Sequence, residues 1–138
     1  MNICYPAIFE PQEPSGFFVQ FVDIENAVTE GETIEECLFN GAEVLTLILE
    51  YRLEHGDVIP PPSTAIEGAH YIAPDPAVQS ALLLRLARGE RPISDLARAM
   101  ETSWAAAQRL EDPRHWPTLK QLDKAARVLG KRLVLSLE

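Results

Sequence analysis

The first part of the chain alternates apolar and polar residues in the way that β-strands do. Residues 2–9 and 16–22 are rich in aromatic and β-branched side chains, and the turn-prone segment 11–15 lies between them. This arrangement predicts a β-hairpin. One side of its second strand is entirely apolar and consists of Phe17, Val19 and Phe21. We therefore expect that side to pack on a core.

A long helix is predicted over about residues 33–55. Thr33 and Glu36 have the spacing of a capping box, and His55-Gly56 is typical of a helix end. Apolar side chains recur between them every three or four residues, as helical packing requires. They are Ile34, Leu38, Ala42 (or Gly41), Leu45, Leu49 and Leu53.

Two short strands complete the first half, one near residues 27–29 before the helix and one over 68–73 after it. The expected order is β-β-β-α-β, with the helix lying across the sheet. The sequence thus predicts an α+β domain over residues 1–73.

Pro74-Asp75-Pro76 breaks the pattern and marks the expected linker, 74–76, between two domains. Beyond it, apolar periodicity, capping residues and stop signals predict an all-α domain over residues 77–138. Its four expected helices cover residues 77–88, 93–100, 104–111 and 119–129. Residues 132–137 then alternate again and predict a short terminal strand.

Charge divides the chain at the same place. Residues 1–76 hold fourteen carboxylates against one cation, Arg52, whereas residues 77–138 hold eleven Lys and Arg against seven carboxylates. Because opposite charges steer encounter and like charges repel, the two halves are expected to attract different partners. The first suits a basic protein, and the second suits nucleic acid.

Composition narrows the class of protein. With 138 residues and 46% hydrophobic residues, the chain can form one ordinary or two small globular domains. Cys4 and Cys37 are expected to be reduced thiols, and no Cys or His spacing predicts a metal site or a cofactor. No signal peptide or membrane-spanning segment is recognisable, so we expect a cytoplasmic protein with no membrane partner.

The segment from Phe21 to Glu36, FVDIENAVTEGETIEE, resembles the signature of HicB-type antitoxins, F-P-D-L-P-G-C-x-T-x-G-D-T-x-E-E. The matching residues are Phe21, Asp23, Thr29, Gly31, Thr33, Glu35 and Glu36. The chain departs from the pattern in its loop, where two prolines and a glycine are replaced by Val22, Glu25 and Asn26. The resemblance implies that the first domain is a partial ribonuclease-H-like fold that binds a small basic, mRNA-cleaving ribonuclease toxin of the HicA type.

The segment from Leu96 to Glu111 is similar to the helix-turn-helix of lambda-repressor-like (XRE-family) domains. Glu101 stands where that pattern has a turn glycine, which costs energy if the residue must adopt a positive φ. The resemblance implies a DNA-binding domain whose third helix enters the major groove with its N-terminal residues first. An unrelated small helical bundle is the alternative.

Within that helix, four side chains are expected to reach base edges: Trp104, Ala105, Gln108 and Arg109. Arginine suits guanine O6/N7, glutamine suits adenine, and alanine suits the thymine methyl group. Trp104 has a second interpretation, in which it covers the helix junction. The expected phosphate contacts are Arg91, Ser103 and Arg114.

The C-terminal strand has no expected neighbour within its own domain. Because an unpaired strand with an apolar side favours association, we predict that it pairs with its mate in a homodimer or a higher oligomer. The alternative is a tail packed against the helices.

Toxin contact is expected at the acidic residues Glu10, Asp23, Glu25 and Glu30. A ribonuclease-H-like order also suggests a two-metal nuclease, but that chemistry needs converging carboxylates, one of them in the middle of the first strand. That strand offers only Glu10, at its end. We therefore expect no enzyme and no catalytic residue.

The most consistent interpretation is an antitoxin that occludes its toxin and represses its own operon through the helix-turn-helix. The alternative is a helix-turn-helix transcriptional regulator whose first domain senses a small ligand. Copurification with a small basic protein would favour the antitoxin, and a bound metabolite would favour the regulator.

Overall fold

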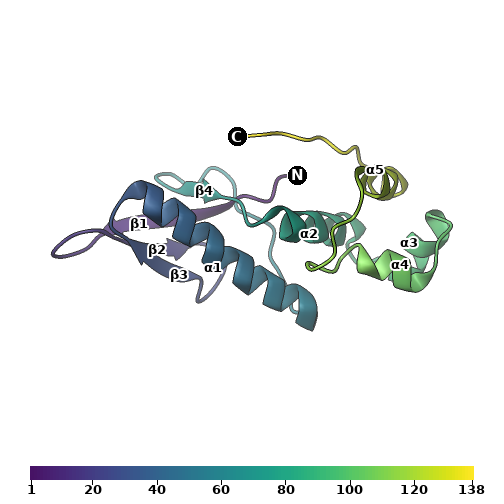
Figure 1. Ribbon diagram of the computed structural model, residues 1–138, viewed down its shortest axis with the longest axis horizontal. Coiled ribbons are helices and arrows are strands. Elements are labelled where there is room, and N and C mark those ends of the chain that lie inside the picture. Colours follow the sequence, from purple (N-terminus) through teal and green to yellow (C-terminus); the bar gives the residue numbers. More distant parts are fainter.

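The computed structural model describes residues 1–138 and contains a four-stranded sheet and five helices (Figure 1). The sheet and its helix comprise β1 (Tyr5–Pro11), β2 (Phe17–Phe21), β3 (Val28–Gly31), α1 (Ile34–His55) and β4 (His70–Ile72). The remaining helices are α2 (Pro76–Arg88), α3 (Ile93–Ala99), α4 (Trp104–Arg109) and α5 (Leu119–Val128). The predicted α+β architecture is confirmed, and so is the order of its elements through the last helix.

The sheet is antiparallel throughout, in the order β3-β2-β1-β4. Val19 of β2 pairs with Phe9 of β1 on one side and with Thr29 of β3 on the other. The inner face carries buried residues such as Val19 and Phe21, and α1 lies across it (Figure 1). The opposite face has no helix over it, which leaves Phe18 partly exposed.

The residues through which α1 packs on the sheet differ in part from those that the sequence predicted. Its buried residues are Cys37, Gly41, Leu45, Thr46 and Leu49. Ile34 and Leu38, which were expected in the core, are each more than one-third exposed. The reason is that the contact follows a four-residue spacing from Cys37. At Gly41 a Cβ atom would lie 2.8 Å from Cδ1 of Ile72, so the glycine lets the helix approach the sheet closely.

Helix α2 contributes to both hydrophobic cores. Val78 and Leu82 are fully buried against the sheet and α1. Leu84 packs in the second core, which α3, α4 and α5 complete with residues such as Leu96 and Ala107. At the start of α2, the backbone N–H of Asp75 donates to the Thr46 hydroxyl at 2.9 Å. The chain segment after the predicted linker is therefore anchored in the first unit.

Three residues other than glycine have a left-handed backbone: Asn26, Ala65 and Glu101. Glu101, between α3 and α4, has φ 54°, which is the positive φ that the sequence comparison anticipated. Asn26, between β2 and β3, has φ 66°, a conformation that asparagine adopts more easily than most residues.

The strand predicted over residues 132–137 is not formed in the single chain. No backbone group of these residues hydrogen-bonds to another segment, and Val134, Leu135 and Leu137 are largely exposed. A strand needs a hydrogen-bonded neighbour, and this chain supplies none there. The segment leads back toward the N-terminus (Figure 1), where burial and then the charge of Glu138 raise the pKa of the Cys4 thiol. No helix of the protein combines the length and apolar character needed to cross a bilayer.

Truncation within or before α2 is expected to weaken the first unit. A fragment that ends at residue 75 loses the burial of Val78 and Leu82, which is worth roughly 3–6 kcal/mol for two such side chains. Urea denaturation followed by circular dichroism should therefore give a lower free energy of unfolding than for a fragment that ends at Gly89. Equal unfolding free energies for the two fragments would contradict this dual packing of α2.

Candidate functional site

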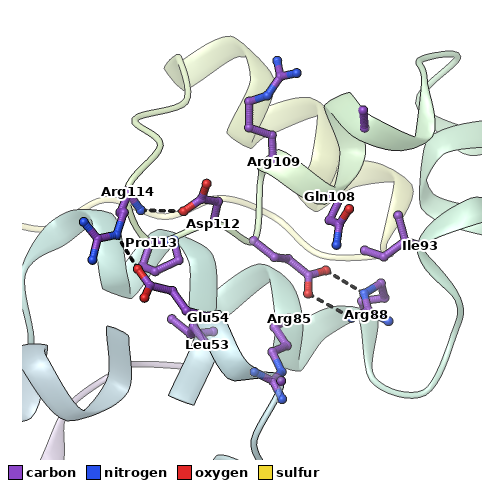
Figure 2. Close-up of a pocket in the computed structure, with 13 residues that line it drawn as sticks. Leu53, Glu54, Arg85, Arg88, Ile93, Gln108, Arg109, Asp112, Pro113 and Arg114 are labelled. Carbon is purple, nitrogen blue, oxygen red and sulfur yellow. Dashed lines mark hydrogen bonds and ion pairs between the residues drawn. The ribbon is translucent and has the colours of Figure 1, made fainter. Parts of the chain in front are cut away.

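An open cleft of about 760 Å³ lies where the C-terminal end of α1 meets α2, α3 and α4. Figure 2 shows Leu53 and Glu54 on the α1 side of the cleft and Gln108 and Arg109 on the α4 side. Four arginines line it, and they come from three parts of the chain: Arg85, Arg88, Arg109 and Arg114. The cleft thus brings the basic half of the chain against the acidic helix.

Arg88 forms the most buried ion pair of the protein. Its Nε and Nη2 donate to the two carboxylate oxygens of Glu111 at 2.6 and 2.9 Å. Only 17% of the Arg88 side chain and 10% of the Glu111 side chain are exposed. The hydrogen bond that Arg88 donates to Glu111 raises the pKa of Arg88 and keeps the guanidinium charged. This bidentate pair fixes the end of α4 on α2 and is structural.

Arg114 connects the two units from the loop that follows α4. Its Nη2 lies 3.2 Å from Oε1 of Glu50, and its Nε pairs with Glu54, both on α1. Figure 2 shows the pair with Glu54. The hydrogen bond to Glu54, followed by the charges of Glu54 and Glu50, raises the pKa of Arg114. The guanidinium is 69% exposed, so solvent screens these pairs and other anions can reach it.

The four expected base-reading residues share one exposed side of α4. Ala107 and Leu110 turn inward to the second core, whereas Trp104, Ala105, Gln108 and Arg109 are all exposed. The Trp104 ring is 54% exposed, so it does not seal the helix junction. Arg109 makes no ion pair.

The three expected phosphate contacts do not lie together. Ser103 caps α4, because its hydroxyl accepts from the backbone N–H of Ala106 at 3.1 Å. Arg114 is at the cleft, but Arg91 is outside it and donates to the carbonyls of Ala87 and Arg88.

The expected toxin contacts are dispersed over the sheet. Glu10 and Glu30 both pair in register with Phe18, so they belong to the sheet face that α1 does not cover. Glu25 is exposed in the turn after β2. Asp23 has a structural role, because its carboxylate accepts from both the backbone N–H and the hydroxyl of Ser63.

Two features of α1 were missed by the sequence reasoning. One is the pair of carboxylates, Glu50 and Glu54, that hold Arg114. The other is a row of exposed large apolar side chains, Phe39, Leu47 and Tyr51, on the side of α1 away from the sheet. Their spacing of eight and four residues was a readable signal, but the search for a core stripe assigned the apolar residues of this helix to one side only.

Comparison with known proteins gives concordant results. Residues 4–77 match the family model described as HicB_like antitoxin of bacterial toxin-antitoxin system. The chain is 32% identical to Antitoxin HicB 1 of Photorhabdus laumondii, over 99% of this chain and 88% of that protein. It is also 32% identical to Antitoxin HicB of Escherichia coli K12, over 95% of this chain and 96% of that protein. The resemblance read from Phe21 to Glu36 is therefore confirmed.

Breaking the buried ion pair is expected to destabilise the chain. Arg88→Ala leaves the Glu111 carboxylate buried without its partner, which costs about 3 kcal/mol. Urea denaturation measures this change in unfolding free energy. Arg98→Ala is the matched control, because the Arg98 side chain is 77% exposed and its pair with Asp95 is worth less than about 0.5 kcal/mol. Equal losses from the two variants would show that Arg88 has no special structural role.

Proposed function

The chain belongs to the HicB-like antitoxin family, and on that basis we propose that it neutralises a small basic toxin and represses the operon that encodes the pair. The toxin would be an mRNA-cleaving ribonuclease of the HicA type. The observation that carries this proposal is the division of charge between two packed units, since residues 1–76 hold fourteen carboxylates against Arg52 alone. Such a surface attracts a protein whose own substrate is a polyanion.

The toxin-binding unit would be the sheet with α1, a partial ribonuclease-H-like fold stabilised by one face of α2. Inhibition would be stoichiometric occlusion, in which carboxylates of this chain cover the toxin surface that engages RNA phosphates. Antitoxins of this family are regulatory proteins, and we assign no catalytic step to this chain. Of the carboxylates expected to meet the toxin, Glu10 and Glu30 lie on the open sheet face and Glu25 lies beside it, so that face is one of two surfaces that could receive the toxin; the outward side of α1 is the other. Asp23 shapes the loop after β2 through Ser63.

The DNA-binding unit would be the α3–α4 pair, acting as a helix-turn-helix. Support comes from the capped, short helix α4, whose outward side carries Ala105, Gln108 and Arg109 with no ion pair at Arg109. These side chains match guanine, adenine and thymine edges in the major groove. Trp104 would lie against the sugar-phosphate backbone beside them.

Phosphate contacts would come from Arg91, Ser103 and Arg114. In the free chain Arg114 is held by Glu50 and Glu54, but these exposed pairs contribute little free energy. A DNA phosphate can therefore replace the carboxylates at small cost. Binding to operator DNA would also place the protein in the cytoplasm.

The apolar C-terminal segment would complete a homodimer. Leu133, Leu135 and Leu137 have the alternation of a strand, and no segment of the same chain pairs with them. Pairing with the same segment of a second chain would give the backbone groups of both segments hydrogen-bond partners. It would also hold two α4 helices at the spacing of adjacent half-sites.

Coexpression tests the antitoxin assignment. The full chain, produced together with the small basic protein encoded beside it, should restore the growth that this neighbour alone inhibits, and the two should copurify. A neighbour that neither inhibits growth nor binds the chain would refute the assignment. Copurification of a small metabolite in its place would favour a ligand-responsive regulator.

The DNA assignment makes a separate prediction about two arginines. Arg109→Ala should relax sequence preference at one operator position at a cost of about 1–3 kcal/mol, because it removes a base contact. Arg114→Ala should weaken all DNA sequences alike, because phosphates carry no sequence information. Binding titrations against a set of single-base operator variants measure both effects. A uniform loss from Arg109→Ala would remove that residue from base reading.

A further inference from the structure

The side of α1 that faces away from the sheet carries large apolar side chains that no other helix or strand covers, although the Tyr51 ring stacks on His55 of the same helix with centroids 3.9 Å apart. Phe39, Leu47 and Tyr51 are 65%, 67% and 58% exposed. They lie within an arc of about 120° around the helix axis. Single exposed apolar residues are ordinary on a protein surface, but three in a row along one helix form a ridge that suits a partner.

Carboxylates accompany this ridge along its length. Glu36, Glu43, Glu50 and Glu54 are spaced by seven, seven and four residues, which puts them on the same side of the helix. The single cation of α1, Arg52, is partly buried and reaches toward the Val58 carbonyl instead. The outward face of α1, meaning these three apolar and four acidic residues, is therefore apolar and uniformly negative.

The chain already shows that this face accepts guanidinium groups. Arg114 crosses from the other unit and pairs with both Glu50 and Glu54, and the pair with Glu54 is seen in Figure 2. Glu36 and Glu43, farther toward the start of the helix, make no ion pair. Half of the acidic positions are thus occupied by an internal cation, and the other half remain available beside Phe39 and Leu47.

The open face of the sheet is the competing surface, and it is less suited to docking. Phe18, Val28 and Tyr71 are 36%, 41% and 42% exposed, less than any residue of the α1 ridge. Its carboxylate Glu30 is already engaged by the side chain of Gln12 at 3.2 Å. The Tyr71 hydroxyl likewise accepts from the backbone N–H of Ile66.

We propose that the outward face of α1 is the surface that binds the toxin. The partner that fits it has an apolar centre, which covers Phe39 and Leu47, and Lys or Arg side chains around that centre, which pair with Glu36 and Glu43. The apolar contact holds the complex, because buried anchors supply most interface affinity, while the carboxylates steer the encounter and fix its register. This inference rests on the proposed antitoxin function and names the part of the molecule that performs it.

The test compares matched substitutions on the two faces of the full chain, with affinity for the purified toxin as the readout. Leu47→Arg and Glu43→Lys alter the α1 face, whereas Val28→Arg and Glu10→Lys make the same types of change on the sheet face. All four side chains point into solvent, so the melting temperature of each free variant should stay near that of the unaltered chain. Operator affinity is a second control for folding.

We expect Leu47→Arg and Glu43→Lys to weaken toxin binding by about tenfold or more, and the two sheet-face variants to change it by less than about threefold. The reverse pattern would overturn the proposal and place the toxin on the sheet while leaving the antitoxin function intact. Failure of the unaltered chain to bind the toxin would instead reject the proposed function, and the docking surface with it.

Discussion

Packing of α2 into two cores is the constraint on which the rest of the structure depends. Val78 and Leu82 complete the core between the sheet and α1, and Leu84 belongs to the core around α3, α4 and α5. One helix of thirteen residues therefore fixes the position of the second, helical unit relative to the acidic unit. The Arg88–Glu111 pair then fixes the end of α4 on the same helix. The cleft and the reach of Arg114 to α1 both follow from this arrangement.

The opposite charges of the two units would let one small chain bind the two partners proposed for it. Electrostatic attraction between the two halves is seen within the chain itself, since Arg114 of the basic half pairs with Glu50 and Glu54 of the acidic half. Glu35, Glu36 and Glu43 of α1 make no ion pair within the chain, and neither does Arg109 of α4. The two proposed binding surfaces thus use opposite charges on separate elements, which lets each select its partner by electrostatics as well as by shape.

Local sequence patterns predicted most of the fold, because capping residues mark where a helix begins and ends and apolar periodicity marks the side of an element that packs. Thr33, Thr118 and the His55-Gly56 step define helix ends in the structure as they do in the sequence, since capping is a local interaction. The double role of Val78 and Leu82 was not predictable, because apolar periodicity shows that a helix has a packed side but not which core receives it. The exposed ridge of α1 was missed for a related reason, since Leu47 and Leu45 look equally core-like in sequence. The strand predicted over residues 132–137 is not formed, because no segment of this chain pairs with it.

Titration of the toxin's RNA cleavage tests most directly whether the chain neutralises a ribonuclease by covering it, as proposed. With toxin at a fixed concentration well above the dissociation constant, cleavage should fall linearly as the chain is added and reach zero at a fixed molar ratio. A fragment that contains the sheet, α1 and α2 should abolish cleavage at the same molar ratio, with no operator DNA present. Cleavage that persists when the complex is fully formed would contradict occlusion, because it would mean that the bound toxin still reaches its RNA.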